Sequence, residues 1–285
     1  MNAARLDGKI ALITGANSGL GKATAIGLAQ LGARVVMVCR SPERGAAAQA
    51  EVIAASGNPQ VDVLTVDLAS QAAIRHGAAS FIEQYSHLHL LVNNAGVSFA
   101  ARRETVDGVE MSLAVNHLAA FLLTHSLLDV LKSSAPARII NVGTRLNTAM
   151  DFDDLQFAKR RYNGLQAYSQ SKLGSQHFTY ELARRLAGTG VTVNCVHPGV
   201  FKSNLGKEDV QEAWYLRLIG AFGALVLPDA TRAAERVLYL AASPEVEGVT
   251  GGYFGDRQRL PAPAQTQDPA ANRRLCDISA ALTKV

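Results

Sequence analysis

The chain has 285 residues, of which 48% are hydrophobic and 18% charged, and its formal net charge is +4. This composition excludes a disordered or fibrous chain, and the length suits one large α/β domain. The basic residues are dispersed, which argues against a nucleic-acid site, and no apolar run is long enough to span a bilayer. Cys39, Cys195 and Cys276 are far apart and lack metal-ligand spacing, and the first residues lack an apolar signal core, so we expect a cytoplasmic protein with reduced thiols.

The first half of the chain alternates short apolar runs with longer helical segments. We expect strands at residues 9–14, 34–39, 61–66 and 88–92 and helices at residues 19–31, 42–55 and 70–85. Gly32 has the position of a helix C-cap, and Pro42 stands in the first turn of its helix, where proline is tolerated. A long helix is expected over residues 107–132.

The same alternation continues to the end of the chain. Strands are predicted at residues 138–142, 191–196 and 252–254, and helices at residues 165–186 and 229–241. A tail covers about residues 256–285, with a Pro/Ala/Gln-rich segment at 260–269 and a short final helix. Strands that alternate with helices through short connections predict one domain with a Rossmann-type, doubly wound parallel sheet and helices on both faces.

A glycine-rich turn follows the first predicted strand. Gly15, Gly19 and Gly21 allow a tight turn and a close approach of the backbone to phosphate oxygens, and the N-terminus of the next helix favours an anion. Asn17, Ser18 and Leu20 belong to the same loop. The segment therefore predicts a cradle for the pyrophosphate of a dinucleotide.

A tyrosine and a lysine stand four residues apart on the helix predicted at 165–186. Tyr168 and Lys172 therefore share one helix face. A nearby ammonium group favours the phenolate, so we expect it to lower the pKa of Tyr168 from its ordinary value of about 10. A tyrosine adjusted in this way can donate and accept a proton near neutral pH.

The end of the second strand distinguishes NAD from NADP. An acidic residue there binds the ribose hydroxyls, whereas an arginine accommodates the 2′-phosphate. The strand ends with Cys39, Arg40 and Ser41, and Arg44 follows one turn later. The sequence therefore predicts NADP, bound through Arg40, while Arg44 has an alternative as a solvated helix charge.

Six motifs in this order resemble the short-chain dehydrogenase/reductase family, over residues 9–254. They are the glycine turn at 14–21, Asp67-Leu68, the segment 93–96, Asn116, the Tyr168/Lys172 pair and Pro198-Gly199. Segments 153–156, 167–173, 188–194, 197–200 and 252–254 are similar to the retinol-dehydrogenase-like branch. That branch contains reductases of apolar aldehydes and ketones. Many of its members carry an N-terminal membrane anchor, which we do not expect here.

The resemblance implies roles for the matching residues. Tyr168 would be the general acid, and Lys172 would hold the nicotinamide ribose. Asn116 would hold a water in a proton relay to the lysine, with a helix-kinking amide as its alternative. The cofactor would also contact the adenine-binding pair Asp67 and Leu68, then Asn93, Ala95 and Gly96, and finally Pro198, Gly199, Val200 and Ser203. Part of the segment 93–96 could instead stabilise the central sheet. We interpret His117 and His197 as structural residues.

One position departs from the family pattern. Thr144 stands where the family usually has a serine whose hydroxyl polarises the substrate carbonyl. Threonine keeps the donor but adds a methyl group and restricts the rotamers. We expect Thr144 to replace the serine. Two alternatives stay open: a redox-neutral reaction such as cyclisation or epimerisation with bound NADP, and an NADP-sensing protein without turnover.

A variable, apolar segment at residues 204–228 lies where the family has its substrate lid. It contains Trp214, Tyr215 and Phe222, which favour a lipophilic small-molecule substrate. Ordinary core packing and peripheral contact with a membrane surface are its alternatives. The family also uses its two long helices for subunit contacts, so a homodimer or homotetramer is expected by analogy.

Overall fold

The computed structural model describes residues 3–145, 148–201 and 229–285. Its sheet has eight strands in the order β3-β2-β1-β4-β5-β6-β7-β8, and only β8 is antiparallel to its neighbour. The strands are β1 (Ile10–Thr14), β2 (Arg34–Cys39), β3 (Val61–Thr65), β4 (Leu90–Asn93), β5 (Ala137–Val142), β6 (Val191–Val196), β7 (Gly252–Gly255) and β8 (Gln258–Arg259). The predicted single-domain, doubly wound Rossmann-type fold is confirmed.

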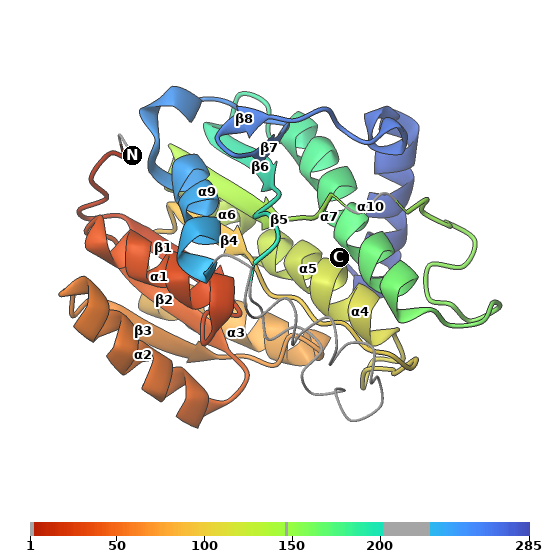
Figure 1. Cartoon of the computed structure of the whole chain (residues 1–285), viewed down its shortest axis with the longest axis horizontal. Coiled ribbons are helices and arrows are strands. Elements are labelled where there is room, and N and C mark those ends of the chain that lie inside the picture. The colour runs from red at the N-terminus through yellow and green to blue at the C-terminus, as the bar shows by residue number, and fades with distance from the viewer. Residues whose placement is uncertain (1–2, 146–147, 202–228) are drawn as a thin grey trace.

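Helices cover both faces of the sheet (Figure 1). One face packs against α1 (Gly19–Gln30), α2 (Pro42–Ser56) and α9 (Ala230–Ala242). The other packs against α3 (Gln71–Gln84), α5 (Ala119–Ser126) and α7 (Gly164–Arg185). Side chains of a strand alternate between the two layers, so Ala11 and Ile13 lie in one core and Leu12 in the other. This burial on both faces is why the parallel strands are continuous apolar runs.

The long helix predicted at residues 107–132 is wrong in its start and in its continuity. The chain instead forms α4 (Met111–Leu113), a π-helical turn η1 (Ala114–Leu118), α5 and α6 (Leu128–Ser133). Glu110 caps the start, because its carboxylate accepts from the N–H groups of Ser112 and Leu113 at 2.9 and 2.7 Å. Gly108, with φ +72°, belongs to the preceding turn. Leu127, between α5 and α6, leaves helical geometry.

The C-terminal segment is more ordered than the sequence indicated. A short 3-10 turn, η3 (Pro244–Val246), precedes β7. A second one, η4 (Ala264–Gln267), follows β8 and leads into α10 (Pro269–Thr283). This helix has 15 residues and buries Leu275, Cys276 and Ser279. His117 and His177 meet it through buried hydrogen bonds to Ser279 and Asn272. The predicted tail is therefore part of the folded domain.

Within the residues that the structure describes, no helix has both the length and the hydrophobicity needed to cross a membrane.

Candidate active site

A cavity of about 900 Å³ lies at the carboxyl ends of the parallel strands. The loops after β1 and β4 form part of its wall, and these adjacent strands are where the strand order reverses. Ligands of doubly wound proteins bind at such a switch point. The cavity volume lies within the range of small-molecule and cofactor sites, about 300–1,000 Å³.

The glycine loop after β1 requires its glycines. Gly15 and Gly19 have φ values of +66° and +52°, in the left-handed region that favours glycine. A methyl group at Gly21 would lie 2.3 Å from the carbonyl oxygen of Gly15, so no side chain fits there. Thr14 fixes the loop against the segment after β4, because its Oγ1 accepts from the N–H groups of Asn94 and Ala95 at 2.9 and 3.0 Å.

The predicted phosphate-binding residues line this cavity together. They are Gly15, Asn17, Ser18, Gly19, Leu20 and Gly21, joined by Arg40 after β2 and Arg44 in the first turn of α2. Helix α1 starts within this loop, and its N-cap Ser18 makes no side-chain capping hydrogen bond. A backbone turn at a helix N-terminus, with two arginines on the same wall, fits the phosphates of a dinucleotide.

The remaining predicted cofactor residues are distributed as follows. Asp67, Leu68, Ala95, Gly96, Pro198, Gly199 and Val200 line the cavity. Asn93 instead lies buried in the sheet, where its Nδ2 donates to Asn141 Oδ1 at 2.9 Å and to Thr124 Oγ1 at 3.1 Å. This placement favours the sheet-stabilising alternative for Asn93. Ser203 and the predicted lid at 204–228 lie outside the described residues.

Helix α7 carries Tyr168 and Lys172 into the cavity wall. Its N-cap Asn163 accepts from the N–H of Gln166 at 3.0 Å, which starts the helix one turn before Tyr168. Lys172 is buried, and its Nζ donates to the carbonyl oxygens of Val142 at 3.1 Å and Ala95 at 3.3 Å. These two bonds place the ammonium group between the ends of β4 and β5.

Burial shifts the pKa values of both residues toward their neutral forms. It raises the pKa of Tyr168 to about 12 and lowers the pKa of Lys172 to about 8. The predicted lowering of the tyrosine pKa by the lysine is therefore wrong for the chain alone, since desolvation dominates. At neutral pH the phenol is protonated and the amine is mostly charged, which is the proton-donating state of the pair.

Thr144 follows the end of β5 and lines the same cavity. Its carbonyl oxygen accepts from Gln176 Nε2 and from Tyr253 Oη, each at 3.0 Å. Tyr168, Lys172 and Thr144 thus reach one cavity from α7 and from the end of β5.

Asn116 lies in the π-helical turn behind the cavity wall. Its Oδ1 accepts from Val97 N at 2.7 Å, while its Nδ2 donates to Val97 O and to Ser171 Oγ at 2.9 Å. These bonds fix the segment after β4 and join it to α7. A methyl group at Gly96 would lie 3.1 Å from Lys172 Nζ and 3.5 Å from Asn116 Oδ1, so the lysine and the asparagine converge there. These bonds fit the structural alternative for Asn116, which is compatible with the predicted water relay.

Sequence reasoning missed several residues of the site. Gln176 carried no motif, although it continues the spacing of Tyr168 and Lys172 along one helix face. Tyr253 belongs to segment 252–254, which supported the resemblance to the family branch but was given no role in the site. His197 was read as structural, yet it lines the cavity. Burial, aided by the charges of Arg236 and Arg145, lowers the pKa of His197 to about 4, so its imidazole is neutral at pH 7. Apolar lining residues that no motif identified are Val97, Phe99, Val106, Met111 and Val115.

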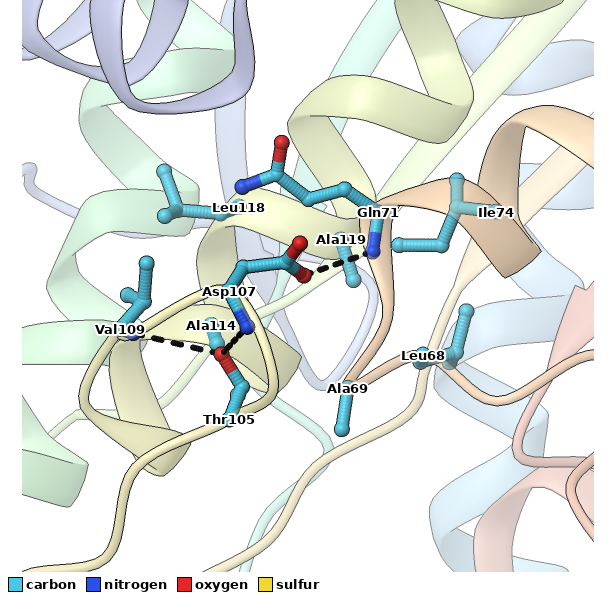
Figure 2. A pocket seen from close by; sticks show the side chains of 10 residues that line it. All are labelled: Leu68, Ala69, Gln71, Ile74, Thr105, Asp107, Val109, Ala114, Leu118 and Ala119. Carbon is cyan, nitrogen blue, oxygen red and sulfur yellow. Dashed lines mark hydrogen bonds between the residues drawn. The ribbon is translucent and has the colours of Figure 1, made fainter.

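A second cavity, of about 10 Å³, has room for about one water molecule. Figure 2 shows that Asp107 accepts from the N–H of Gln71, the first residue of α3, and that Thr105 Oγ1 accepts from the N–H groups of Asp107 and Val109. Leu68 and Thr105 line both cavities. The turn at residues 105–109 therefore supports one wall of the large cavity. The small cavity itself has no room for a substrate.

Comparison with known proteins gives consistent matches. A family model described as short chain dehydrogenase matches residues 9–214. Human retinol dehydrogenase 13 is 43% identical over 284 residues, which cover 98% of this chain and 86% of that protein. Mouse retinol dehydrogenase 11 is 43% identical over 278 residues, which cover 96% of this chain and 86% of that protein.

Solved structures agree in fold. A crystal structure of an uncharacterized protein from Mycobacterium paratuberculosis has a TM-score of 0.81 and 30% identity, covering 100% of this chain and 96% of that one. An NADP complex of Pseudomonas aeruginosa RhlG has a TM-score of 0.70 and 28% identity, covering 89% of this chain and 96% of that one.

Together with the doubly wound sheet, these matches define an oxidoreductase that uses a nicotinamide dinucleotide. The chain belongs to the short chain dehydrogenase family, and within it to the retinol-dehydrogenase-like branch.

Proposed function

We propose that this protein is an NADPH-dependent carbonyl reductase, or in reverse an alcohol dehydrogenase, for a lipophilic aldehyde, ketone or secondary alcohol. The observation that carries the proposal is that Tyr168, Lys172 and Thr144 line the same cavity as the glycine loop and Arg40. A phosphate cradle and a proton donor in one cavity are the requirements of carbonyl reduction.

Each residue of the site has a chemical task in this proposal. When bound, the nicotinamide cofactor supplies the hydride. Tyr168, kept protonated by a raised pKa, donates a proton to the carbonyl oxygen. Thr144 donates a hydrogen bond to the same oxygen as negative charge develops there. Lys172 provides a cation beside the loop that follows β4.

The cofactor choice rests on the end of β2. Arg40 and Arg44 line the cavity, and Ser41 caps α2 by accepting from the N–H of Arg44 at 3.2 Å. The nearby carboxylate, Glu43, accepts from Ser41 Oγ at 2.7 Å. An arginine at this position favours a 2′-phosphate over free ribose hydroxyls. Two of the similar solved structures are described as NADP complexes, which supports the same choice.

The substrate class rests on the lining and on the relatives. Val97, Phe99, Val106, Met111, Val115 and Val200 give the cavity an apolar portion. The curated relatives quoted above are named retinol dehydrogenases, after a lipophilic alcohol. We therefore propose that the substrate of this protein is also lipophilic. The homodimer or homotetramer and the cytoplasmic location stay predictions.

The test is consumption of NADPH with a panel of apolar aldehydes and ketones, run in parallel with NADH and followed by product analysis. Replacing Tyr168 with phenylalanine removes the proton donor and should lower turnover at least about 100-fold while NADPH still binds. Product formed without net NADPH change would instead support the redox-neutral reaction. Tight NADPH binding without any product would support the sensing protein.

A further inference from the structure

The carbonyl oxygen of Thr144 has two buried partners from distant parts of the chain. Gln176 Nε2 and Tyr253 Oη both donate to it at 3.0 Å. Gln176 and Tyr253 are only 1% and 3% exposed, so these bonds are shielded from competing water. The two donors therefore occupy both lone pairs of one peptide oxygen in the wall of the active site.

The two donors come from a helix and from a strand. Gln176 lies one helical turn beyond Lys172 on the same face of α7. Tyr253 lies on β7, which reaches β5 only across β6. The backbone after β5 is thus held both by helix α7 and by a strand two positions away in the sheet.

The residue before Thr144 contributes no side chain to this fixation. A methyl group at Gly143 would lie 2.7 Å from Cys195 Sγ and 3.8 Å from Gln176 Cγ, so the chain passes this point without a side chain. Gly143 N donates to Val196 O at 2.9 Å, and Lys172 bonds to Val142 O. The bonds from Gln176 and Tyr253 then determine how the peptide leaves Thr144.

We propose that Gln176 and Tyr253 are positioning residues that direct the hydroxyl of Thr144 toward the substrate carbonyl. This inference rests on the proposed function. A β-branched side chain has few rotamers, so the direction of its hydroxyl follows the backbone closely. A serine rotates more freely than a threonine to compensate for a displaced backbone. The replacement of the usual serine by Thr144 therefore requires a backbone that is held in place.

The kinetic test uses Tyr253→Phe and Gln176→Met, which remove the donors and keep similar volumes. Each should lower kcat about 10- to 100-fold, because a small misplacement near the reacting atoms is costly, with little change in the Kd of NADPH. The matched control is Tyr85→Phe, which removes a partly buried tyrosine hydrogen bond of 2.9 Å to Asp62 on β3, away from the cavity. The control should retain parental kcat.

A double-mutant cycle separates positioning from general stability. In a Thr144→Val background the hydroxyl is gone, so Tyr253→Phe should change kcat less than about twofold. In a Thr144→Ser background its effect should also shrink, because serine can rotate. An equal loss of kcat in all three backgrounds would overturn the proposal, since the role would then be independent of the threonine.

A spectroscopic measurement keeps the inference testable without turnover. The methyl signal of Thr144, assigned by its disappearance in Thr144→Ser, should shift in Tyr253→Phe and Gln176→Met and stay in place in Tyr85→Phe. If the signal shifts but the parent reduces no carbonyl compound, positioning holds and the proposed function fails. If the signal is unmoved in both variants, the positioning role is wrong, whatever the turnover.

Discussion

Lys172 donates from its Nζ to the carbonyl oxygen of Val142 over 3.1 Å, so the cation of the Tyr168/Lys172 pair is bonded directly to the end of the central strand β5. Burial removes water from this ammonium group, and two carbonyl oxygens replace only part of its solvation. Its pKa falls to about 8 for that reason, while that of the neighbouring Tyr168 rises to about 12.

These shifts predict the pH dependence of reduction. The active form has a charged Lys172 and a protonated Tyr168, so kcat/KM should decrease as pH rises through about 8, where the lysine loses its proton. The tyrosine adds no loss below about 12. Profiles of kcat/KM report ionisations of the free enzyme, so steady-state rates from pH 6 to 10 are the measurement.

Lys172→Arg provides the control for this profile. An arginine keeps its proton throughout the range, so the decrease near pH 8 should vanish from whatever activity remains. A parental profile that is flat from pH 7 to 9.5 would show that the charge of Lys172 does not govern the rate.

Arg40 should select NADPH over NADH. Arg40→Ala removes a charge-assisted contact that only the 2′-phosphate can make, worth about 1.5–3 kcal/mol, or roughly a 10- to 150-fold weaker Kd for NADPH. The affinity for NADH should change little. Fluorescence titration with both cofactors measures this, and Arg34→Ala, at the opposite end of β2, is the control because Arg34 pairs with Asp62 instead. Equal weakening of both cofactors would contradict the assignment.

Local patterns explain why so much of the site was visible in the sequence. The apolar strand before Gly15 and the four-residue spacing of Tyr168 and Lys172 are properties of neighbouring residues. The interruption of the helix predicted at 107–132, by contrast, does not follow from neighbouring residues. Its π-helical turn accompanies the bonds from Asn116 to Val97, a residue 19 positions away, and no periodicity encodes such a contact.

The direction of the tyrosine pKa shift was predicted wrongly for a related reason. Spacing placed a cation near Tyr168, but the sign of the shift depends on how deeply the chain buries the phenol. The contacts of Gln176 and Tyr253 with Thr144 join positions 32 and 109 residues apart. Only the packed sheet brings such residues together.

The buried histidines should make stability fall at acid pH. His117 shares a 2.8 Å hydrogen bond with Ser279, and burial, with His177 nearby, lowers the pKa of His117 from 6.5 to about 3. Between about pH 6.5 and 3, His117 is therefore protonated in the unfolded chain but neutral in the folded chain. The stabilisation is complete above about pH 6.5 and is lost as pH falls toward 3, by up to about 1.4 kcal/mol per pH unit.

Urea unfolding at pH 7, 6, 5 and 4 measures this slope. His117→Gln removes the titrating group, so its free energy of unfolding should depend less steeply on pH than that of the parent. His76→Gln, at an exposed position of α3, should keep the parental slope. Identical slopes for the parent and His117→Gln would mean that His117 does not limit acid stability.

Thr144 should act as a working replacement for the usual serine. A donor directed at the carbonyl oxygen stabilises charge that grows during hydride transfer, and losing one such donor costs about 100- to 1,000-fold in rate. Thr144→Val keeps the branched shape and removes the donor, so it should lose turnover by that factor with little change in the Kd of NADPH. Thr144→Ser keeps the donor and should retain or raise kcat. The measurement is kcat with the best substrate of the panel, alongside cofactor titration. If Thr144→Val matches the parent, the hydroxyl takes no part in reduction, and a redox-neutral reaction with bound NADP becomes the better hypothesis.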